Sequence, residues 1–225
     1  MSRGPARMGS SQRVYARRNL KAIAARWDAR ANFWDEALHD PHFHLNEDDA
    51  YRRFIRSAKR IISHRRRFCK KHGVIDAGCG TGLVLEEIVA DFAWGIGVDI
   101  SPRMIRSARV KRIPHAKFLA GDCFELASLC PKAGAVVSRG VLLSHYGRQQ
   151  SPAILAAIRA SIVPKGFALV DFLNETGRSR HIHAPENKTW FNRQEIRLAA
   201  RNAGFSSIKI LGHSDRRVLR LLAEA

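Results

Sequence analysis

The sequence predicts an α/β fold: a seven-stranded, mostly parallel sheet with helices on both faces, an antiparallel strand towards the C-terminus and a helical cap at the N-terminus. Three observations support this. Residues 74–82 pass from an apolar pair through Asp76 into glycines at alternate positions, which is typical of a strand that turns into a helix. A second strand ends at Asp99 and a third ends at Asp122, with a helical segment between them.

Length and composition indicate one domain with an N-terminal extension. The chain has 225 residues, 45% of them hydrophobic, and no apolar run approaches the roughly 20 residues of a membrane helix. We expect a basic, disordered arm in residues 1–18, a helical cap in residues 19–72 and the sheet domain in residues 73–225. The four cysteines form no C-x-x-C pair, which favours free thiols and a cytoplasmic location.

The cap is predicted to begin with an aromatic amphipathic helix. Apolar side chains recur along one face of it, at Ile23, Trp27, Ala31 and Trp34. A polar connection follows, in which His42 and His44 have no evident third ligand, so we expect no metal site.

A second cap helix is predicted to follow Asn46 and Asp49, which resemble a capping box. Its apolar face runs from Tyr51 to Ile62, and its other face carries Arg and Lys side chains that continue as far as Lys71. We expect this basic face to lie beside the mouth of the site. Both a solvated outer surface and a surface that binds a polyanion agree with the pattern.

Short sequence patterns mark the first helices and strands of the sheet domain. The glycines open a helix over residues 83–92, and Ser101 and Pro102 supply the N-cap and the first residue of the next helix. Apolar and β-branched runs predict the first five strands at residues 74–76, 94–99, 116–122, 133–137 and 167–172.

Two further segments surround the fifth strand. Ser151 and Pro152 are expected to cap a helix, and a turn at residues 164–166 leads into the strand. Residues 173–189 are too long and too polar for a plain connection, so we expect a functional or disordered loop there.

The C-terminal part has clear boundaries. Asn192 and Glu195 form a second capping box, and the helix that they open stops at Gly204. Residues 205–211 and 217–222 are predicted to close the sheet as an antiparallel hairpin.

Taken together, the three strand ends resemble the motifs of the class I S-adenosylmethionine-dependent methyltransferases. Residues 76–82 resemble the first motif of that family, residues 97–101 the second and residues 121–123 the third. The resemblance extends over residues 73–225 and implies a Rossmann-like fold, S-adenosylmethionine as the cofactor and S-adenosylhomocysteine as the product. The aromatic string in residues 26–35 resembles the segment that covers cofactor and acceptor in many small-molecule members.

The residues themselves agree with such a cofactor. The glycine turn offers backbone N–H groups to a ligand, and Asp99 follows Gly78 by 21 residues, near the spacing at which doubly wound folds place an acid beside a ribose. The resemblance implies that Asp122 faces the adenine amino group, while Asp76 either orients the turn or meets the cofactor's amino group through water. The implied cofactor set is Asp76, Gly78, Cys79, Gly80, Thr81, Gly82, Asp99, Ile100, Met104, Asp122, Cys123 and Ser138.

The end of the fourth strand borders both cofactor and acceptor in this family. His145 and Tyr146 are therefore the candidates for catalysis, and a histidine with a pKa near 6.5 is suited to accept a proton from an alcohol or amine. A phenolate or carboxylate acceptor would need no base. The residues expected to bind the acceptor are Trp27, Trp34, Arg139, His145 and Tyr146.

We prefer an oxygen or nitrogen of a small molecule as the acceptor. The Pro-Pro-Tyr/Phe and Pro-Cys strings of nucleobase methyltransferases do not follow the fourth strand. A net charge of +19, concentrated in residues 1–72, keeps RNA or a protein as an alternative, although an Arg-rich coding bias explains the charge equally well. A cofactor-binding regulator without transferase activity is the third class. We expect no membrane partner, and the oligomeric state stays open.

Overall fold

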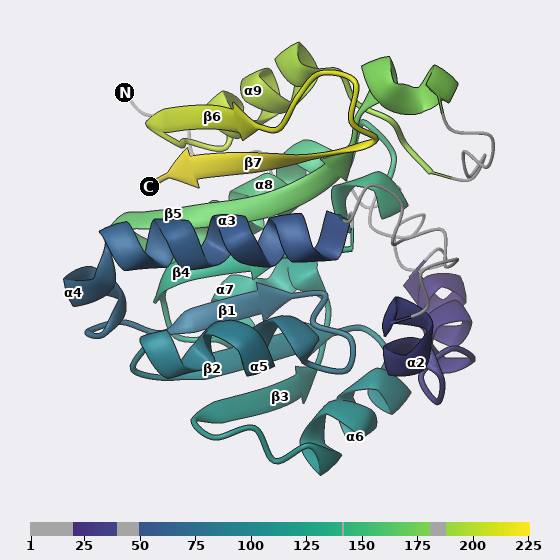
Figure 1. The fold of residues 1–225 in the computed structure, drawn as a ribbon, viewed down its shortest axis with the longest axis vertical. Helices are drawn as coiled ribbons and strands as arrows, with labels where there is room; N and C mark the ends of the chain where they lie inside the picture. Colours follow the sequence, from purple (N-terminus) through teal and green to yellow (C-terminus); the bar gives the residue numbers. More distant parts are fainter. Residues whose placement is uncertain (1–19, 40–49, 141, 181–187) are drawn as a thin grey trace.

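The structure is a computed structural model that describes residues 20–39, 50–140, 142–180 and 188–225 (Figure 1). Its sheet contains β1 (Val74–Ala77), β2 (Gly95–Asp99), β3 (Ala116–Ala120), β4 (Ala133–Ser138), β5 (Ile162–Leu173), β6 (Ser207–Leu211) and β7 (Val218–Glu224). The strands lie in the order β3-β2-β1-β4-β5-β7-β6. β7 runs antiparallel to β5 and β6, and the other neighbours pair in parallel, so the predicted fold is confirmed.

Helices flank this sheet on both sides. Residues 20–28 are helical. The α-helices that follow are α2 (Trp34–His39), α3 (Ala50–His64), α4 (Arg66–Cys69), α5 (Leu83–Ile88), α6 (Pro102–Val110), α7 (Leu126–Leu129), α8 (Ser151–Ala160) and α9 (Arg193–Asn202). Short 3₁₀ helices are η2 (Val89–Asp91), η3 (Cys123–Glu125), η4 (Leu142–His145) and η5 (Glu175–Arg180).

Two apolar layers cover the faces of the sheet. On the face nearer the viewer in Figure 1, α3 buries Phe54 in the same cluster as Val74 of β1. On the other face, α8 buries Leu155 in the same cluster as Ile75, because successive residues of a strand point to opposite sides. Full burial of a side chain of this kind contributes about 1.5–3 kcal/mol. The two layers therefore hold the strand ends in fixed positions.

The carboxyl ends of β1, β2 and β4 meet at one edge of the sheet. β1 lies between β2 and β4, so the order of the strands reverses direction at this point. Such a switch point leaves a crevice beyond the strand ends, where ligands bind in open α/β sheets. Residues 20–28 and α2 lie beside this edge (Figure 1).

Two of the predicted helix caps are confirmed. The Oγ atom of Ser101 accepts a hydrogen bond of 3.1 Å from the amide of Met104 at the start of α6. Asn192 and Glu195 exchange hydrogen bonds of 2.9 Å with each other's backbone amides and open α9 as a capping box. Both caps satisfy amides that the first helical turn leaves unpaired.

Two other helix ends differ from prediction. The helix expected over residues 83–92 is α-helical only to Ile88 and then tightens into η2. Ser151 is the first residue of α8 rather than its cap, and Gln150 takes the cap position. The chain already turns before α8, where the amide of Gln150 donates to the carbonyl of Gly147 at 2.9 Å, so the helix begins earlier than the Ser-Pro signal suggested.

The fifth strand is also longer than expected. β5 begins at Ile162, so the predicted turn at residues 164–166 lies inside the strand. The register against β4 shifts between the pairs Ala133–Ile162 and Ala135–Phe167. An irregularity of this kind accommodates proline and glycine within a strand because the inserted residues need no ladder hydrogen bond.

The apolar face of α3 packs on the sheet as predicted, but the basic segment that follows it does not lie beside the site. α4 lies at the opposite end of the sheet from α2 (Figure 1). Arg65 forms an ion pair with Glu224, whose strand partner is Phe167 near the start of β5. The expected basic surface at the mouth of the site is therefore wrong for residues 65–71.

Some predictions lie outside the described residues: the arm in residues 1–18, His42, His44 and the capping box at Asn46 and Asp49. Within the described ranges, no helix is long and apolar enough to cross a membrane. The same part of the chain holds no group of three His, Cys, Asp or Glu side chains placed to bind a metal. All four cysteines are buried and unpaired.

Candidate cofactor and acceptor site

The turn after β1 depends on its glycines. Gly78, Gly80 and Gly82 have φ angles of 75°, 53° and 85°, in the left-handed region that side chains with a Cβ rarely adopt. The amide of Gly78 donates to the carbonyl of Val98 at 2.8 Å and so ties the turn to the end of β2. The turn thus lies against the neighbouring strand, with its backbone exposed to the crevice.

Asp99 fixes the second side of the crevice. Its Oδ2 atom accepts a hydrogen bond of 2.9 Å from the amide of Gly80, and its Oδ1 atom accepts one of 2.8 Å from the amide of Ser101. Burial raises the pKa of this carboxyl, and the backbone hydrogen bonds oppose that shift. Each oxygen keeps a further lone pair that can accept a hydroxyl donor.

Asp76 is a buried carboxyl without a partner. Its side chain is 1% exposed, and neither of its oxygens has a hydrogen-bond partner among the described residues. Burial raises its pKa to about 8, and the charges of Asp99 and Asp171 add to the shift. A buried acceptor of this kind is costly unless a donor or a cation meets it. Asp76 therefore suits a positively charged ligand group.

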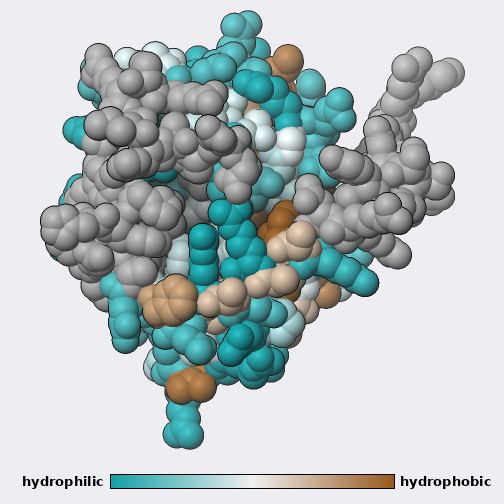
Figure 2. Space-filling view, turned by 90° about the vertical axis from the view of Figure 1, so that its right-hand side faces the viewer, coloured by the Kyte–Doolittle hydropathy of each residue, from teal (hydrophilic) through white to brown (hydrophobic). Residues whose placement is uncertain are grey.

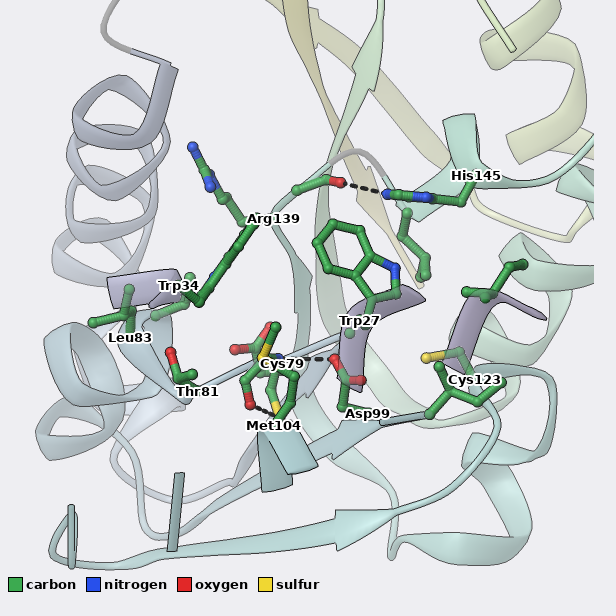
Figure 3. A pocket seen from close by; sticks show the side chains of 18 of the residues that line it. Trp27, Trp34, Cys79, Thr81, Leu83, Asp99, Met104, Cys123, Arg139 and His145 are labelled. Atoms are coloured by element: carbon green, nitrogen blue, oxygen red, sulfur yellow. Dashed lines mark hydrogen bonds between the residues drawn. The ribbon is translucent and has the colours of Figure 1, made fainter. Parts of the chain in front are cut away.

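These residues line a cavity of about 90 Å³, seen from close by in Figure 3. Nine residues of the predicted cofactor set are in its wall: Asp76, Gly78, Cys79, Gly80, Thr81, Asp99, Ile100, Met104 and Cys123. All five predicted acceptor residues are there too. Gly82, Asp122 and Ser138 are outside it. Asp122 accepts a hydrogen bond from the amide of Phe124, and Ser138 donates one to the carbonyl of Ala77.

Two aromatic rings cover the cavity. The rings of Trp27 and Trp34 meet edge to face with centroids 5.1 Å apart, and Trp27 lies 5.2 Å from the ring of His145. A Cβ on Gly80 would lie 3.6 Å from the Nε1 atom of Trp34, so this tryptophan packs directly over the glycine turn.

Two carboxylates hold this aromatic segment, residues 20–39, in place; we call it the strap. Asp28 accepts hydrogen bonds from the Oγ atom of Ser101 at 2.6 Å and from the amide of Arg103 at 3.0 Å. Asp35 accepts a hydrogen bond from Thr81 and pairs with Lys111 at 2.6 Å. Small-molecule sites usually measure about 300–1,000 Å³, so the cavity beneath the strap is small for such a site.

The end of β4 supplies the other wall. In Figure 3 the ring of Trp27 lies between Asp99 on one side and Arg139 and His145 on the other. The Nε2 atom of His145 donates to the carbonyl of Gly140 at 3.2 Å. Burial lowers the pKa of His145 to about 3, and the nearby positive charge of Lys188 adds to the shift. His145 is therefore a neutral ring with weak basicity.

Tyr146 is buried in the core behind the cavity. Its side chain is 6% exposed and packs edge to face on Phe124, with centroids 5.3 Å apart. Burial raises the pKa of its phenol well above the usual range, so the hydroxyl stays protonated. Tyr146 can donate a hydrogen bond, but it cannot serve as a base near neutral pH.

Lys188 was not identified from the sequence. Its Nζ atom contacts the ring of His145, 3.0 Å from Nε2, and lies 5.8 Å from the centroid of the Trp27 ring. Burial lowers its pKa to about 7, and the charges of Arg26 and Arg30 contribute. No motif marks this lysine, since it lies in the long segment before Trp190 and reaches the site only through the fold.

Other residues of the site were also missed. Asp28 and Asp35 each follow a tryptophan of the strap, seven positions apart; the aromatic string of residues 26–35 contains both, but neither was predicted to be a site residue. Asp171 on β5 is buried and accepts a hydrogen bond of 3.2 Å from the amide of Gly140. Further wall residues that the sequence did not mark are Ile23, Tyr51, Leu83, Val84, Gly140 and Leu142.

Comparison with known proteins gives a family and a set of folds. Residues 74–166 match the model of a family described as "methyltransferase domain". No curated protein sequence matches the chain.

Three solved structures are similar in fold. Magnesium protoporphyrin IX methyltransferase from Synechocystis PCC 6803, with S-adenosylmethionine bound, has a TM-score of 0.70 at 18% identity, over 92% of this chain and 96% of that one. CalS10, an amino pentose methyltransferase from Micromonospora echinaspora, has a TM-score of 0.62 at 21% sequence identity, and the match covers 83% of this chain and 99% of that one. A DhpI complex has a TM-score of 0.67 at 16% sequence identity, and the match covers 91% of this chain and 96% of that one.

Proposed function

Residues 74–166 are a methyltransferase domain of the class I, S-adenosylmethionine-dependent type, and from this premise we propose that the protein methylates an oxygen or nitrogen of a small-molecule acceptor. The observation that carries the proposal is the covered cavity beneath Trp27 and Trp34. A polymer acceptor would need an open groove at the strand ends. Figure 2 shows the face that the strap occupies, and the described side chains there are mostly hydrophilic.

The described residues fit the cofactor. The glycine turn presents backbone N–H groups, and Asp99 has lone pairs left for two ribose hydroxyls, each worth about 1.5–3 kcal/mol as a charged hydrogen bond. Asp76 offers the buried, unpartnered carboxyl that a methionine ammonium group would satisfy. Ile100 and Met104 supply apolar wall for the adenine.

When bound, S-adenosylmethionine supplies a methyl group that passes from its positively charged sulfur to a lone pair of the acceptor, which loses a proton where it carries one. The protein's part is mainly alignment, which contributes roughly 7–11 kcal/mol for well-oriented partners. Trp27 and Trp34 cover the cavity and exclude water from it. On the opposite side, the glycine turn and Asp99 fix the position of the cofactor.

His145 and Tyr146 are better suited to position the acceptor than to remove its proton. The low pKa of His145 makes it a weak base, and its Nδ1 atom contacts Lys188. The raised pKa of Tyr146 keeps its hydroxyl protonated. Both side chains nevertheless line the cavity, so they contact whatever occupies the acceptor end.

The test is methyl transfer from labelled S-adenosylmethionine to three fractions of a cell extract: small molecules, RNA and protein. We expect label in the small-molecule fraction, and less label there with an Asp99→Ala variant at limiting cofactor. Label in RNA or protein alone would contradict the small-molecule acceptor. Tight cofactor binding with no label in any fraction would instead indicate a regulator.

A further inference from the structure

A cluster of positive charge surrounds Trp27, whose ring lines the cavity. The guanidinium carbon of Arg30 lies 5.4 Å from the centroid of the Trp27 ring, and the Nζ atom of Lys188 lies 5.8 Å from it. Arg26 precedes Trp27 directly and stands four positions before Arg30, a spacing that brings side chains together on a helical turn. We call Arg26, Arg30 and Lys188 the cation cluster.

Within the described part of the chain, no carboxylate pairs with the cation cluster. None of the three acids of the strap pairs with the cluster: Asp28 accepts hydrogen bonds from Ser101 and the amide of Arg103, Asp35 contacts Thr81 and Lys111, and Glu36 is exposed on α2. Lys188 is half-buried, and among the described residues it contacts the neutral ring of His145 and the face of Trp27. Like charges this close repel one another, so the arrangement is costly until an anion joins it.

The pKa shifts of Lys188 and Arg30 agree with a cluster that lacks a counter-charge. Burial and then the charges of Arg26 and Arg30 lower the pKa of Lys188 to about 7. Burial and Arg26 lower the pKa of Arg30 as well. A cation whose pKa is lowered by neighbouring positive charges is stabilised by a nearby anion.

We propose that the acceptor carries an oxyanion, a carboxylate or a phosphate, that binds to the cation cluster of Arg26, Arg30 and Lys188 beside Trp27. This rests on the proposed function and narrows its substrate class. Asp76 and Asp99 in the cavity wall then suit a positively charged cofactor, and the cation cluster beside Trp27 suits a negatively charged acceptor. Guanidinium groups suit oxyanions because they donate two parallel hydrogen bonds.

The binding test uses inorganic phosphate and acetate as probes on the protein loaded with S-adenosylhomocysteine. Calorimetry should detect binding that weakens at least tenfold in Lys188→Gln and in Arg30→Gln, and Lys188→Arg should restore it. Lys71→Gln, an exposed charge at the far end of the sheet, is the matched control and should bind as the unaltered protein does. At pH 8 binding should also take up protons, because an anion raises the pKa of Lys188. Equal binding in all variants would overturn the proposal.

The acceptor test separates the small-molecule pool of an extract by anion exchange before labelled methyl transfer. We expect label in the anionic fraction, reduced in Lys188→Gln and in Arg30→Gln. Phosphatase treatment of that fraction distinguishes the sources, since it destroys a phosphate-bearing acceptor and spares a carboxylate. Label confined to the uncharged fraction would contradict the proposal that the acceptor carries an oxyanion, but it would still agree with methylation of a small molecule. Label only in RNA or protein would overturn both.

Discussion

The amide of Gly80 donates a hydrogen bond of 2.9 Å to the Oδ2 atom of Asp99, so the turn after β1 and the acid at the end of β2 hold each other in position. Asp99→Ala should remove both this brace and the acceptors for the ribose hydroxyls. We expect affinity for S-adenosylmethionine to fall by one to two decades, about 1.5–3 kcal/mol, in a calorimetric titration. Asp91→Ala, which removes a half-buried acid on η2 outside the cavity wall, should change nothing. Unaltered affinity in Asp99→Ala would place the cofactor elsewhere.

Asp76 should couple cofactor binding to proton release. Its pKa of about 8 means that the carboxyl is mostly protonated at pH 7 in the free protein. A cationic ammonium group beside it favours the ionised form, so binding should release up to one proton. Calorimetry in buffers of different ionisation enthalpy measures that number. Asp76→Asn should abolish the release, and a release that persists in this variant would assign it to another group.

Asp76 should also make folding stability depend on pH. The pKa is about 8 in the folded protein and about 3.8 in an unfolded chain. The unfolded state therefore loses its proton first as pH rises, and stability falls between about pH 4 and pH 8. Asp76→Asn should gain melting temperature relative to the unaltered protein at pH 8 but not at pH 4. An equal gain at both values would point to packing rather than charge.

The strap should close less firmly when its acids are neutralised. Asp28→Asn and Asp35→Asn weaken charged hydrogen bonds to Ser101 and Thr81 near the surface, each worth roughly 0.5–1.5 kcal/mol. We expect the cofactor to dissociate about two- to tenfold faster in stopped-flow tryptophan fluorescence. Glu36→Gln removes the same charge from an exposed position on α2 and is the matched control. Equal rates in all three variants would show that these carboxylates do not retain the strap.

Lys188 should give the acceptor's KM a pH dependence. The lysine is charged below its pKa of about 7, in the neighbourhood of Arg26, Arg30 and the neutral His145. If its charge holds the acceptor, KM should rise as pH increases from 7 to 9 while kcat changes little. Lys188→Arg should remove this dependence, because a guanidinium stays charged throughout. A kcat that rises with pH would instead identify the neutral amine of Lys188 as a base.

Basic residues at the far end of the sheet should be irrelevant to methyl transfer. Arg66, Arg67 and Lys71 are exposed and lie at the opposite end from the strap. Replacing all three with Gln should leave transfer to the small-molecule fraction unchanged. If these residues held RNA, log K would fall with log salt at a slope of about −0.7 to −0.9 per phosphate contact, and the triple variant would lose that slope. Salt-dependent RNA methylation lost in the variant would contradict the proposed acceptor.

The fold and the cofactor end of the site were predictable because their signals are local. The alternate glycines, Asp99 at a strand end and the Ser101 cap each need only neighbours in the sequence, and each is where the pattern predicted. The strand at residue 162 was not predictable, since Pro164 and Gly166 usually mark a turn and only pairing with β4 keeps them inside β5.

The acceptor end could not be read from the sequence in the same way. Lys188 reaches His145 from 43 positions away, and the amide of the next residue, Thr189, donates a hydrogen bond to the carbonyl of Ser144 in η4. The pKa of His145 likewise depends on burial and on charges from separate segments, so its residue type suggested a base that its surroundings make weak. Long-range contacts of this kind produce no periodic pattern in the sequence.

The acid pair at the floor of the cavity bears on how each catalytic cycle ends. Asp76 and Asp99 lie in the wall of a site whose cofactor would carry one positive charge fewer after methyl transfer than before it. The spent cofactor should therefore be held less strongly than the fresh one by the same two carboxylates. Loss of that charge would favour replacement of the spent cofactor by a fresh one.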